Sequence, residues 1–405
     1  MTVLLISPFI NPEAVGEPRW CYELAKAVSS RVETVIVTQS PRKYDFKVAE
    51  LFPGVQVYEH KPWELDILPR RVHALFKPNY LRFYHEASKV ISSQLDLKPI
   101  RCAHHFGPLA LRYPTPLHRA GIPYAIGPLG GSLPTPAGFG SGNGGQPWYY
   151  RLRDLDRLRF RYDPWLRSSY QNAECVVGVA DYVRDVLSPM KLRRFACFPE
   201  VTALAPDKRV REALAQRRLH EGPARFLIVS RLIFSKGIQY ALKAAATLDR
   251  DRDWRIDIVG DGPMRAELEA MLDSLSLRDR VTLHGFVPRE RVDDFYRDAD
   301  IFLFPSIREP SGAVVFEAMS WGLPMISAAY GGPEAHVDDS FGQRVGVASQ
   351  AGFIEGLRVA MKELLSSGER RAAMGEAAIE AAETRHSPAA MADFFLKLYE
   401  SIGRT

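Results

Sequence analysis

The stretch from Ile301 to Glu334, IFLFPSIREPSGAVVFEAMSWGLPMISAAYGGPE, constrains the fold most strongly. It opens with the apolar run Ile301–Phe304, which predicts a buried strand. After a short loop, a helix is predicted from Ser311 to Trp321, and Gly322 can end it in a left-handed conformation. A second buried strand is predicted at Pro324–Ala328. A strand, a helix and a strand within about thirty residues predict a βαβ unit of a parallel sheet.

The same unit carries acidic side chains on both sides of a helix start. Glu309 precedes the helix, and Glu317 lies eight residues further on, about two turns away. Between them, Ser311, Gly312 and Ala313 place unpaired backbone N–H groups, which attract anions such as phosphate. A sugar nucleotide fits this arrangement, because it combines a diphosphate with ribose and hexose hydroxyls. Taken singly, either Glu is better explained as an exposed surface acid.

The segment REPSGAVVFEAMSWGLP resembles the E-x7-E signature of retaining glycosyltransferases of the GT4 family, which have the GT-B fold. The EAM-x-x-G-x-P and GG-x-E patterns within the stretch are also similar to the family. The resemblance implies that Glu309 contacts the transferred sugar and that Glu317 contacts the ribose of the nucleotide. It further implies an α/β chain of two Rossmann-like, doubly wound domains that face one another across a cleft.

Length and composition fit this expectation. A chain of 405 residues usually forms two domains, and a hydrophobic content of 46% suffices for two cores. No apolar run approaches the ~20 residues of a membrane span, and the N-terminus lacks the features of a signal peptide. Four scattered cysteines show no metal or disulfide spacing. The net charge of +5 does not by itself argue for nucleic-acid binding. We therefore expect a cytoplasmic protein without metal, cofactor or nucleic-acid partner.

The predicted elements divide the chain into two α/β domains. Residues 1–200 form the expected acceptor-binding domain, and residues 207–387 form the expected donor-binding domain. The interdomain linker is predicted at Phe198–Pro206, which has no clear periodicity and contains prolines. The last helix, at about Pro388–Ile402, is expected to pack back on the first domain, as in GT-B proteins.

The donor domain offers cations at the end of its first predicted strand, Phe226–Ser230. Arg231 and Lys236 follow this strand just before a predicted helix, where they can neutralise a diphosphate. The pattern R-L-x-x-x-K-G also matches the phosphate-binding pattern of the GT4 family. Gly260 and Val287 follow the next two strands, and we include them as donor-binding residues. The resemblance implies that the backbone near Val287 contacts the base of the nucleotide. Backbone contacts do not depend on side chains, so the sequence does not identify the base, and we expect UDP or GDP as the nucleotide.

Candidates in the first domain follow its predicted strands. Gly16 lies in the first strand–helix loop, where the GT4 family carries a glycine pair that contacts the donor phosphate or the acceptor, and we include it as a donor-binding residue. An ordinary turn glycine is the alternative. His104 and His105 end a strand and can hydrogen-bond a sugar hydroxyl or phosphate. We include His105 as a candidate catalytic residue and His104 as an acceptor-side residue, with a structural role as the alternative for both. Backbone N–H groups of Gly130 and Gly131 are expected to bind the acceptor.

Two further segments bear on the acceptor. The run GFGSGNGG at Gly138–Gly145 predicts a flexible hinge or lid. Trp148–Arg167 predicts an amphipathic helix with an apolar arc that includes Leu158 and Tyr162 and with arginines on the opposite face. One interpretation is a solvated polar face. The other is peripheral contact with anionic lipid, or with a lipid-linked acceptor, at the inner membrane face.

These features together predict a metal-independent hexosyltransferase of the EC 2.4.1 type, such as those of polysaccharide biosynthesis. It would move a hexose from a nucleoside-diphosphate sugar to a glycan, lipid-linked or small-molecule acceptor, with retention of the anomeric configuration. Two alternatives stay open. A sugar-nucleotide 2-epimerase has the same architecture, and a non-catalytic sugar-nucleotide binder would need the same clamp.

Overall fold

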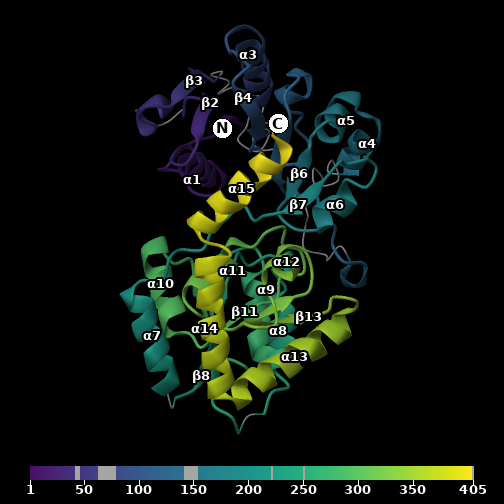
Figure 1. Ribbon diagram of the computed structural model, residues 1–405. Helices are drawn as coiled ribbons and strands as arrows, with labels where there is room; N and C mark the ends of the chain where they lie inside the picture. Colours follow the sequence, from purple (N-terminus) through teal and green to yellow (C-terminus); the bar gives the residue numbers. More distant parts are fainter. Residues whose placement is uncertain (42–45, 63–78, 141–153, 220–221, 250, 404–405) are drawn as a thin grey trace. The chain divides into compact units, whose positions relative to one another are not determined.

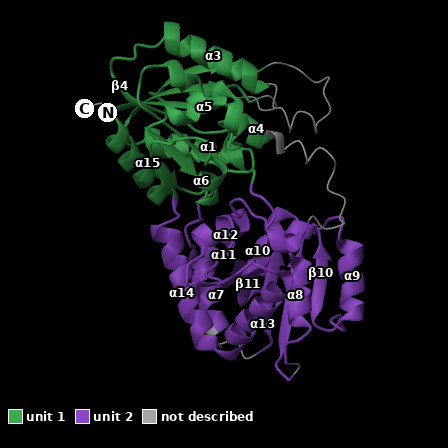
Figure 2. Ribbon diagram, turned by 90° about the vertical axis from the view of Figure 1, so that its right-hand side faces the viewer, with its two compact units in different colours: residues 1–132, 148–201, 388–405 green, residues 133–147, 202–387 purple. Residues whose placement is uncertain are grey.

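The computed structural model describes residues 1–41, 46–62, 79–140, 154–219, 222–249 and 251–403 (Figure 1). The chain divides into two compact units (Figure 2). Unit 1 comprises residues 1–132, 148–201 and 388–405, and unit 2 comprises residues 133–147 and 202–387. The boundary between residues 201 and 202 falls inside the predicted linker. Residues 133–147, which we assigned to the first domain, belong to unit 2.

Unit 1 is built on a parallel sheet, with seven strands in the part of the chain that the structure describes. Their order is β3-β2-β1-β4-β5-β6-β7, so the order reverses between β1 and β4, as in Rossmann-like folds. The elements are β1 (Thr2–Ser7), α1 (Glu17–Ser29), β2 (Glu33–Gln39), η1 (Val48–Leu51), β3 (Gln56–His60), α3 (Asn79–Ser93), β4 (Ile100–His105), η2 (Pro116–Arg119), β5 (Tyr124–Leu129), α4 (Asp154–Tyr162), α5 (Pro164–Gln171), β6 (Cys175–Gly178), α6 (Tyr182–Val186), β7 (Phe195–Cys197) and α15 (Pro388–Ile402).

The first strand shows why the strands of unit 1 appear as continuous apolar runs. Val3 and Leu5 pack into the core that α1 and α15 share. Leu4 and Ile6 point to the other face, where they pack with residues of α3 and α5. A strand that is covered on both faces needs apolar side chains at every position, which is typical of parallel sheets.

The last helix, α15, packs on unit 1. Its Phe395 lies edge-to-face against Trp20 of α1, with ring centroids 6.3 Å apart. Its bounds, Pro388–Ile402, are those that the sequence predicted. Just before α15, the backbone N–H of Ala203 donates to the carbonyl of His386 at 2.8 Å. The two stretches of chain that leave unit 2 at residues 202 and 387 are therefore hydrogen-bonded to one another.

The prediction of one continuous helix over Trp148–Arg167 is wrong. Helix α4 ends at Tyr162, and the Asp163 carboxylate then caps α5 by accepting from two backbone N–H groups. Residues 148–153 lie outside the described part of the chain. The side chains of Leu158 and Tyr162 are 55% and 67% exposed, whereas Phe160 is buried. The predicted apolar arc therefore faces solvent at these two positions.

Unit 2 has a second parallel sheet, whose described strands follow the order β10-β9-β8-β11-β12-β13. The order reverses between β8 and β11. The elements are η3 (Ala137–Phe139), α7 (Lys208–Leu219), β8 (Ala224–Val229), η5 (Phe234–Lys236), α8 (Ile238–Ala245), β9 (Trp254–Val259), α9 (Arg265–Ser274), β10 (Val281–Gly285), α10 (Arg289–Asp298), β11 (Ile301–Phe304), α11 (Ala313–Ser320), β12 (Met325–Ala328), α12 (Gly332–His336), β13 (Gly342–Val345), α13 (Gln350–Ser366) and α14 (Gly368–Thr384).

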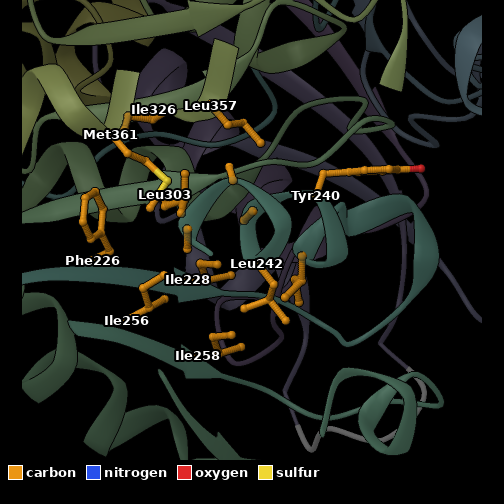
Figure 3. Packing of buried hydrophobic residues seen from close by; sticks show 14 of the residues in the cluster. Phe226, Ile228, Tyr240, Leu242, Ile256, Ile258, Leu303, Ile326, Leu357 and Met361 are labelled. Carbon is orange, nitrogen blue, oxygen red and sulfur yellow. The ribbon is translucent and has the colours of Figure 1, made fainter. Parts of the chain in front are cut away.

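Strands and helices of unit 2 share one continuous apolar core. Figure 3 shows part of it, with Phe226 and Ile228 of β8, Tyr240 and Leu242 of α8, and Leu357 and Met361 of α13. The predicted βαβ unit is present as β11, α11 and β12. Both units are therefore Rossmann-like α/β structures, which confirms the predicted fold class. In the described residues, no helix has the length and apolarity that crossing a membrane requires.

Candidate functional site

The candidate site lies at the carboxyl ends of the strands of unit 2, where the strand order reverses. Open α/β sheets bind ligands at this position. The turn after β8 carries Lys236, and the loop after β11 carries Glu309. The two loops are joined directly, because the carbonyl of Ser235 accepts from the N–H of Ile307 at 3.0 Å and from the hydroxyl of Ser306 at 3.2 Å.

A glycine brings these loops together. Gly237, directly after Lys236, has φ 68°, and a Cβ built on it would lie 1.9 Å from the carbonyl oxygen of Pro305. Only glycine permits this approach without backbone movement. The result is an ion pair between Lys236 Nζ and Glu309 Oε2. Their side chains are 16% and 14% exposed, and Lys236 Nζ also lies 5.6 Å from the centroid of the Phe304 ring.

The turn after β12 fixes the backbone of the Glu309 loop. The N–H of Gly332 donates to the carbonyl of Glu309 at 2.9 Å. A Cβ on Gly331 would lie 2.3 Å from the same carbonyl oxygen, so the two backbones are in close contact. The GG-x-E pattern of the sequence is thus a brace for the Glu309 loop. Among the described residues, Glu309 Oε1 has no hydrogen-bond partner, whereas Oε2 is held by Lys236.

The start of α11, which follows the Glu309 loop, has backbone N–H groups without an acceptor in the described part of the chain. Gly312 is the N-cap with φ 88°, and the helix begins at Ala313, which is exposed. The N–H of Val315 donates to the Gly312 carbonyl at 2.8 Å. The N–H groups of Gly312 and Ala313 have no acceptor in the described part of the chain, and neither does the buried hydroxyl of Ser311. Such a helix start can bind a phosphate oxygen.

Glu317, in the second turn of α11, is held by two residues that the sequence analysis did not identify. Its Oε2 accepts from the hydroxyl of Tyr296 at 2.9 Å and pairs with Arg289 at 2.8 Å. Burial, and then the charge of Glu317, raise the pKa of Tyr296 well above its ordinary value, so the hydroxyl remains a donor. Oε1 of Glu317 has no partner among the described residues. Arg289 and Tyr296 are seven positions apart on α10, which places them on one face of the helix. The spacing does not indicate which residue they contact.

The other candidates of unit 2 differ in what they offer a ligand. Arg231 is exposed in the loop after β8, ahead of the turn that carries Lys236. Val287 is half-buried after β10. The N–H of Gly260 already donates to the carbonyl of Gly285 at 2.9 Å, and its φ of 135° permits a close approach to β8. We therefore assign Gly260 to strand packing, since its N–H is not available to a ligand.

The unit 1 candidates correct part of the sequence analysis. His104 is fully buried, and both ring nitrogens are used: Nε2 donates to the carbonyl of Gly127 and Nδ1 accepts from the hydroxyl of Tyr399, each at 2.7 Å. His105 is buried against Tyr80, with the rings stacked at 6.2 Å. Burial lowers the pKa of His104 and of His105 to about 3, so both imidazoles are neutral. In this structure both are residues of the unit 1 core.

The expected acceptor-binding amides are also occupied. The N–H of Gly130 donates to the carbonyl of Leu109 at 2.7 Å, and the N–H of Gly131 donates to the hydroxyl of Tyr182 at 2.9 Å. An acceptor would have to displace these partners to bind the two N–H groups. Gly16 is exposed as the N-cap of α1, with nothing within 4 Å of a Cβ built there, and it stays a candidate.

Comparison with protein families supports the assignment of unit 2. Residues 210–381 match the family model described as "Glycosyl transferases group 1". Over these residues, the chain is similar to the group 1 glycosyltransferases. The GT4-type resemblance that was drawn from the E-x7-E pattern is thereby confirmed. The matched region contains Lys236, Glu309, the start of α11 and Glu317, so these parts of the candidate site all lie within it.

Curated relatives point to the same family. The chain is 29% identical over 251 residues to the alpha-D-kanosaminyltransferase of Streptomyces kanamyceticus, covering 58% of this chain and 63% of that protein. It is 29% identical over 217 residues to the lipopolysaccharide core biosynthesis glycosyltransferase LpsD of Rhizobium meliloti, covering 52% and 60%. The chain thus spans less than two thirds of the length of these relatives.

Solved structures share the fold over nearly the whole chain. A sucrose-phosphate synthase from Thermosynechococcus elongatus is 20% identical, with a TM-score of 0.63 and coverage of 99% and 98% of the two chains. The Anabaena protein Alr3699/HepE, solved in complex with UDP, is 16% identical, with a TM-score of 0.60 and coverage of 99% and 100%. At these identities the likeness concerns the fold.

Proposed function

We propose that this glycosyltransferase moves a hexosyl group from a nucleoside-diphosphate sugar to an acceptor hydroxyl, with retention of the anomeric configuration. One observation carries the proposal. A cation–carboxylate pair, an open helix start and a second carboxylate gather at one edge of the unit 2 sheet. This set matches the parts of a sugar nucleotide, which are a diphosphate, a hexose and a ribose.

Each side chain has a role that follows from its contacts. Lys236, with Arg231 in the loop after the same strand β8, neutralises the diphosphate, and the N–H groups at the start of α11 bind its oxygens. Oε1 of Glu309 accepts hydrogen bonds from hexose hydroxyls, and Oε1 of Glu317 accepts them from ribose hydroxyls. In both residues Oε2 is already bound by the protein. Anchored carboxylates lose little further side-chain freedom when the ligand binds.

In the transfer step, negative charge develops on the leaving diphosphate, beside cations and N–H donors that the protein holds in place. The bond between the anomeric carbon and the β-phosphate oxygen breaks, and its electron pair stays on the phosphate. The acceptor oxygen forms its bond to the same face of the anomeric carbon, and its proton passes to the leaving phosphate. Lys236, Arg231 and the α11 N–H groups stabilise the negative charge of the leaving diphosphate. In this proposal protein cations perform the task that a metal ion performs in other transferases.

The proposal leaves three acceptor classes, a glycan, a lipid-linked sugar or a small molecule. The names of the relatives include both lipopolysaccharide core synthesis and transfer of a kanosaminyl group. We place the acceptor on unit 1 and the reaction in the cytoplasm, with peripheral contact to the membrane if the acceptor is lipid-linked. The exposed Leu158 and Tyr162 are the side chains of α4 that such contact would use.

A two-step experiment tests the proposal. Purified protein is first screened by thermal shift with UDP, GDP and other nucleoside diphosphates. Binding to the folded state adds RT ln(1 + [L]/Kd), about 2.7 kcal/mol at one hundred times Kd, so the preferred base stands out. The matching sugar nucleotide is then incubated with and without acceptors. Consumption only with an acceptor supports transfer. Conversion of the donor alone indicates an epimerase, and the absence of any binding contradicts the proposal.

A further inference from the structure

One segment of unit 2 comes from the sequence of unit 1. Residues 133–139, LPTPAGF, directly follow β5 and its GPLGGS loop, yet they belong to unit 2. We call residues 133–139 the strap. Ser132, the last unit 1 residue before it, has φ 54°, a left-handed conformation that residues other than glycine rarely adopt. The chain therefore leaves unit 1 through a strained residue and enters the strap.

The far end of the strap is anchored in the core of unit 2. Phe139 is 1% exposed, and its ring stands edge-to-face against Tyr240 of α8 at 5.2 Å and Phe353 of α13 at 5.6 Å. The backbone before it is equally close, since a Cβ on Gly138 would lie 2.5 Å from the carbonyl oxygen of Ala348. The glycine-rich run thus begins with a firmly packed turn, although its composition predicts a flexible hinge or lid.

The near end of the strap contacts the loops around Glu309. The buried side chain of Leu133 lies against Gly331, the glycine whose backbone contacts the Glu309 carbonyl. Thr135 Oγ1 lies 3.5 Å from Nη1 of Arg308, the residue directly before Glu309. In addition, the hydroxyl of Tyr330 donates to the carbonyl of Pro134 at 3.0 Å.

The anchor also reaches the loop that carries Lys236. The Tyr240 ring that packs on Phe139 contacts Phe234 as well, with centroids 6.3 Å apart. Phe234 opens the single turn that ends at Lys236, and its carbonyl accepts from the N–H of Gly237 at 3.1 Å. One end of the strap is thus linked to the Lys236 turn, and the other end contacts the Glu309 loop.

We propose that the strap is a positioning element of the donor site, with Phe139 as its anchor. It holds the Lys236 turn and the Glu309 loop at the separation at which both meet one diphosphate sugar. The assignment of this pair to the donor rests on the proposed function, whereas the positioning itself is a property of unit 2. Phe139 touches no substrate in this proposal and acts through the two loops.

Hydrogen–deuterium exchange of the full-length protein tests the positioning. The four amides to follow belong to the two loops and their brace, and each is hydrogen-bonded: Lys236, Gly237, Ile307 and Gly332. The test variant is F139L, and the matched control is F226L in the same core. Phe226 is fully buried in β8, and Figure 3 shows it well apart from Tyr240, which holds the anchor.

We expect F139L to speed exchange at these four amides about tenfold, because local opening becomes easier when one contact of a packed unit is lost. F226L should lower global stability. The exchange rates of these four amides, compared with those of the other amides of unit 2, should stay as in the wild type. If F139L does not fold, T135V supplies the readout, with faster exchange expected at Gly332, on the Glu309 side. Unchanged exchange in the folded strap variant, or an equal increase in F226L, overturns the proposal.

Nucleotide binding provides the second readout. F139L should weaken affinity for the preferred nucleoside diphosphate about tenfold, since binding must then order the two loops. F226L should bind as the wild type does. If the wild type binds no nucleoside diphosphate, the proposed function fails, while the exchange measurement still decides the role of the strap.

Discussion

Replacing Lys236 by alanine removes one partner of the ion pair at the centre of the candidate site. The pair is mostly shielded, with side-chain exposures of 16% and 14%, and Glu309 Oε2 has Lys236 as its partner. In the ligand-free protein, Lys236 is therefore engaged by Glu309. A diphosphate that binds there must share this cation with the carboxylate. Replacing Lys236 should therefore weaken nucleotide affinity, whereas replacing Glu309 should strengthen it.

The contacts set the magnitudes. A hydrogen bond to a charged group contributes about 1.5–3 kcal/mol, so K236A should weaken the affinity for a nucleoside diphosphate about 10- to 100-fold. E309Q removes a competing negative charge and should strengthen that affinity. K236A should also cost about 1–3 kcal/mol of stability, because a shielded carboxylate loses its partner. In K236A/E309Q the stability should recover, because neutral glutamine needs no counter-charge, and the affinity should not.

The assay is a double-mutant cycle on the four proteins. Stability is measured by urea unfolding, and affinity by calorimetry with the sugar-free nucleoside diphosphate, because Glu309 is assigned to the sugar. If K236A binds the nucleotide within about twofold of the wild type, Lys236 is not a diphosphate ligand. If the double variant regains affinity together with stability, Lys236 serves only to neutralise Glu309.

Three further predictions follow from single contacts. G237A should cost at least about 1–3 kcal/mol in urea unfolding, since the new Cβ meets the Pro305 carbonyl at 1.9 Å in a left-handed conformation. Y296F loosens Glu317, whose Oε2 accepts from the Tyr296 hydroxyl. Because Glu317 is proposed to bind the ribose and not the reacting carbon, the variant should raise KM for the donor several-fold with little change in kcat; an equal fall in kcat would contradict this role. His105 has a folded-state pKa of about 3 and an ordinary value of 6.5, so the unfolded chain binds the extra proton between these values and stability falls as pH falls. H105F should remove about 1.4 kcal/mol per pH unit from that slope in unfolding at pH 4–6, and retained activity would assign His105 a purely structural role.

The sequence was most informative where the chemistry follows the chain locally. The βαβ unit from Ile301 onwards was predicted because its strands are apolar and its helix is bounded by a glycine, Gly322, which adopts φ 61° as expected. Lys236 and Glu309 lie on different loops, but both follow strands of one parallel sheet. Because such strands end at the same edge, their proximity could be expected from the sequence alone.

The sequence was least informative where a partner comes from a distant element. Arg289 and Tyr296 were missed because nothing along α10 indicates that Glu317 of α11 lies beside it. His104 was assigned to the acceptor because it ends a strand, but its side chain faces the core and contacts Tyr399, almost three hundred residues later. Strand ends place a residue at the correct edge, while the alternation of side chains decides which face it meets.

The strap shows the same limit for a whole segment. Glycines and prolines at residues 133–140 predict a loop, and the position between unit 1 elements suggests a loop of that unit. Only the core of unit 2 reveals the slot between Tyr240 and Phe353 that Phe139 fills. A single aromatic residue can outweigh a flexible composition, because burying one such ring contributes about 1.5–3 kcal/mol. The loops of the candidate site are therefore held by side chains that share none of its motifs.

Both glutamates of the candidate site follow one arrangement, which gives the separate observations a common physical meaning. In each carboxylate, Oε2 is bound by the protein and Oε1 has no partner among the described residues. The bound oxygen fixes the side chain before any ligand arrives, so less conformational entropy is lost on binding. The second oxygen keeps an acceptor ready for a hydroxyl. A binding site for a polyhydroxylated ligand needs both properties, whereas a purely structural ion pair has no need to leave one oxygen unpaired in two separate places.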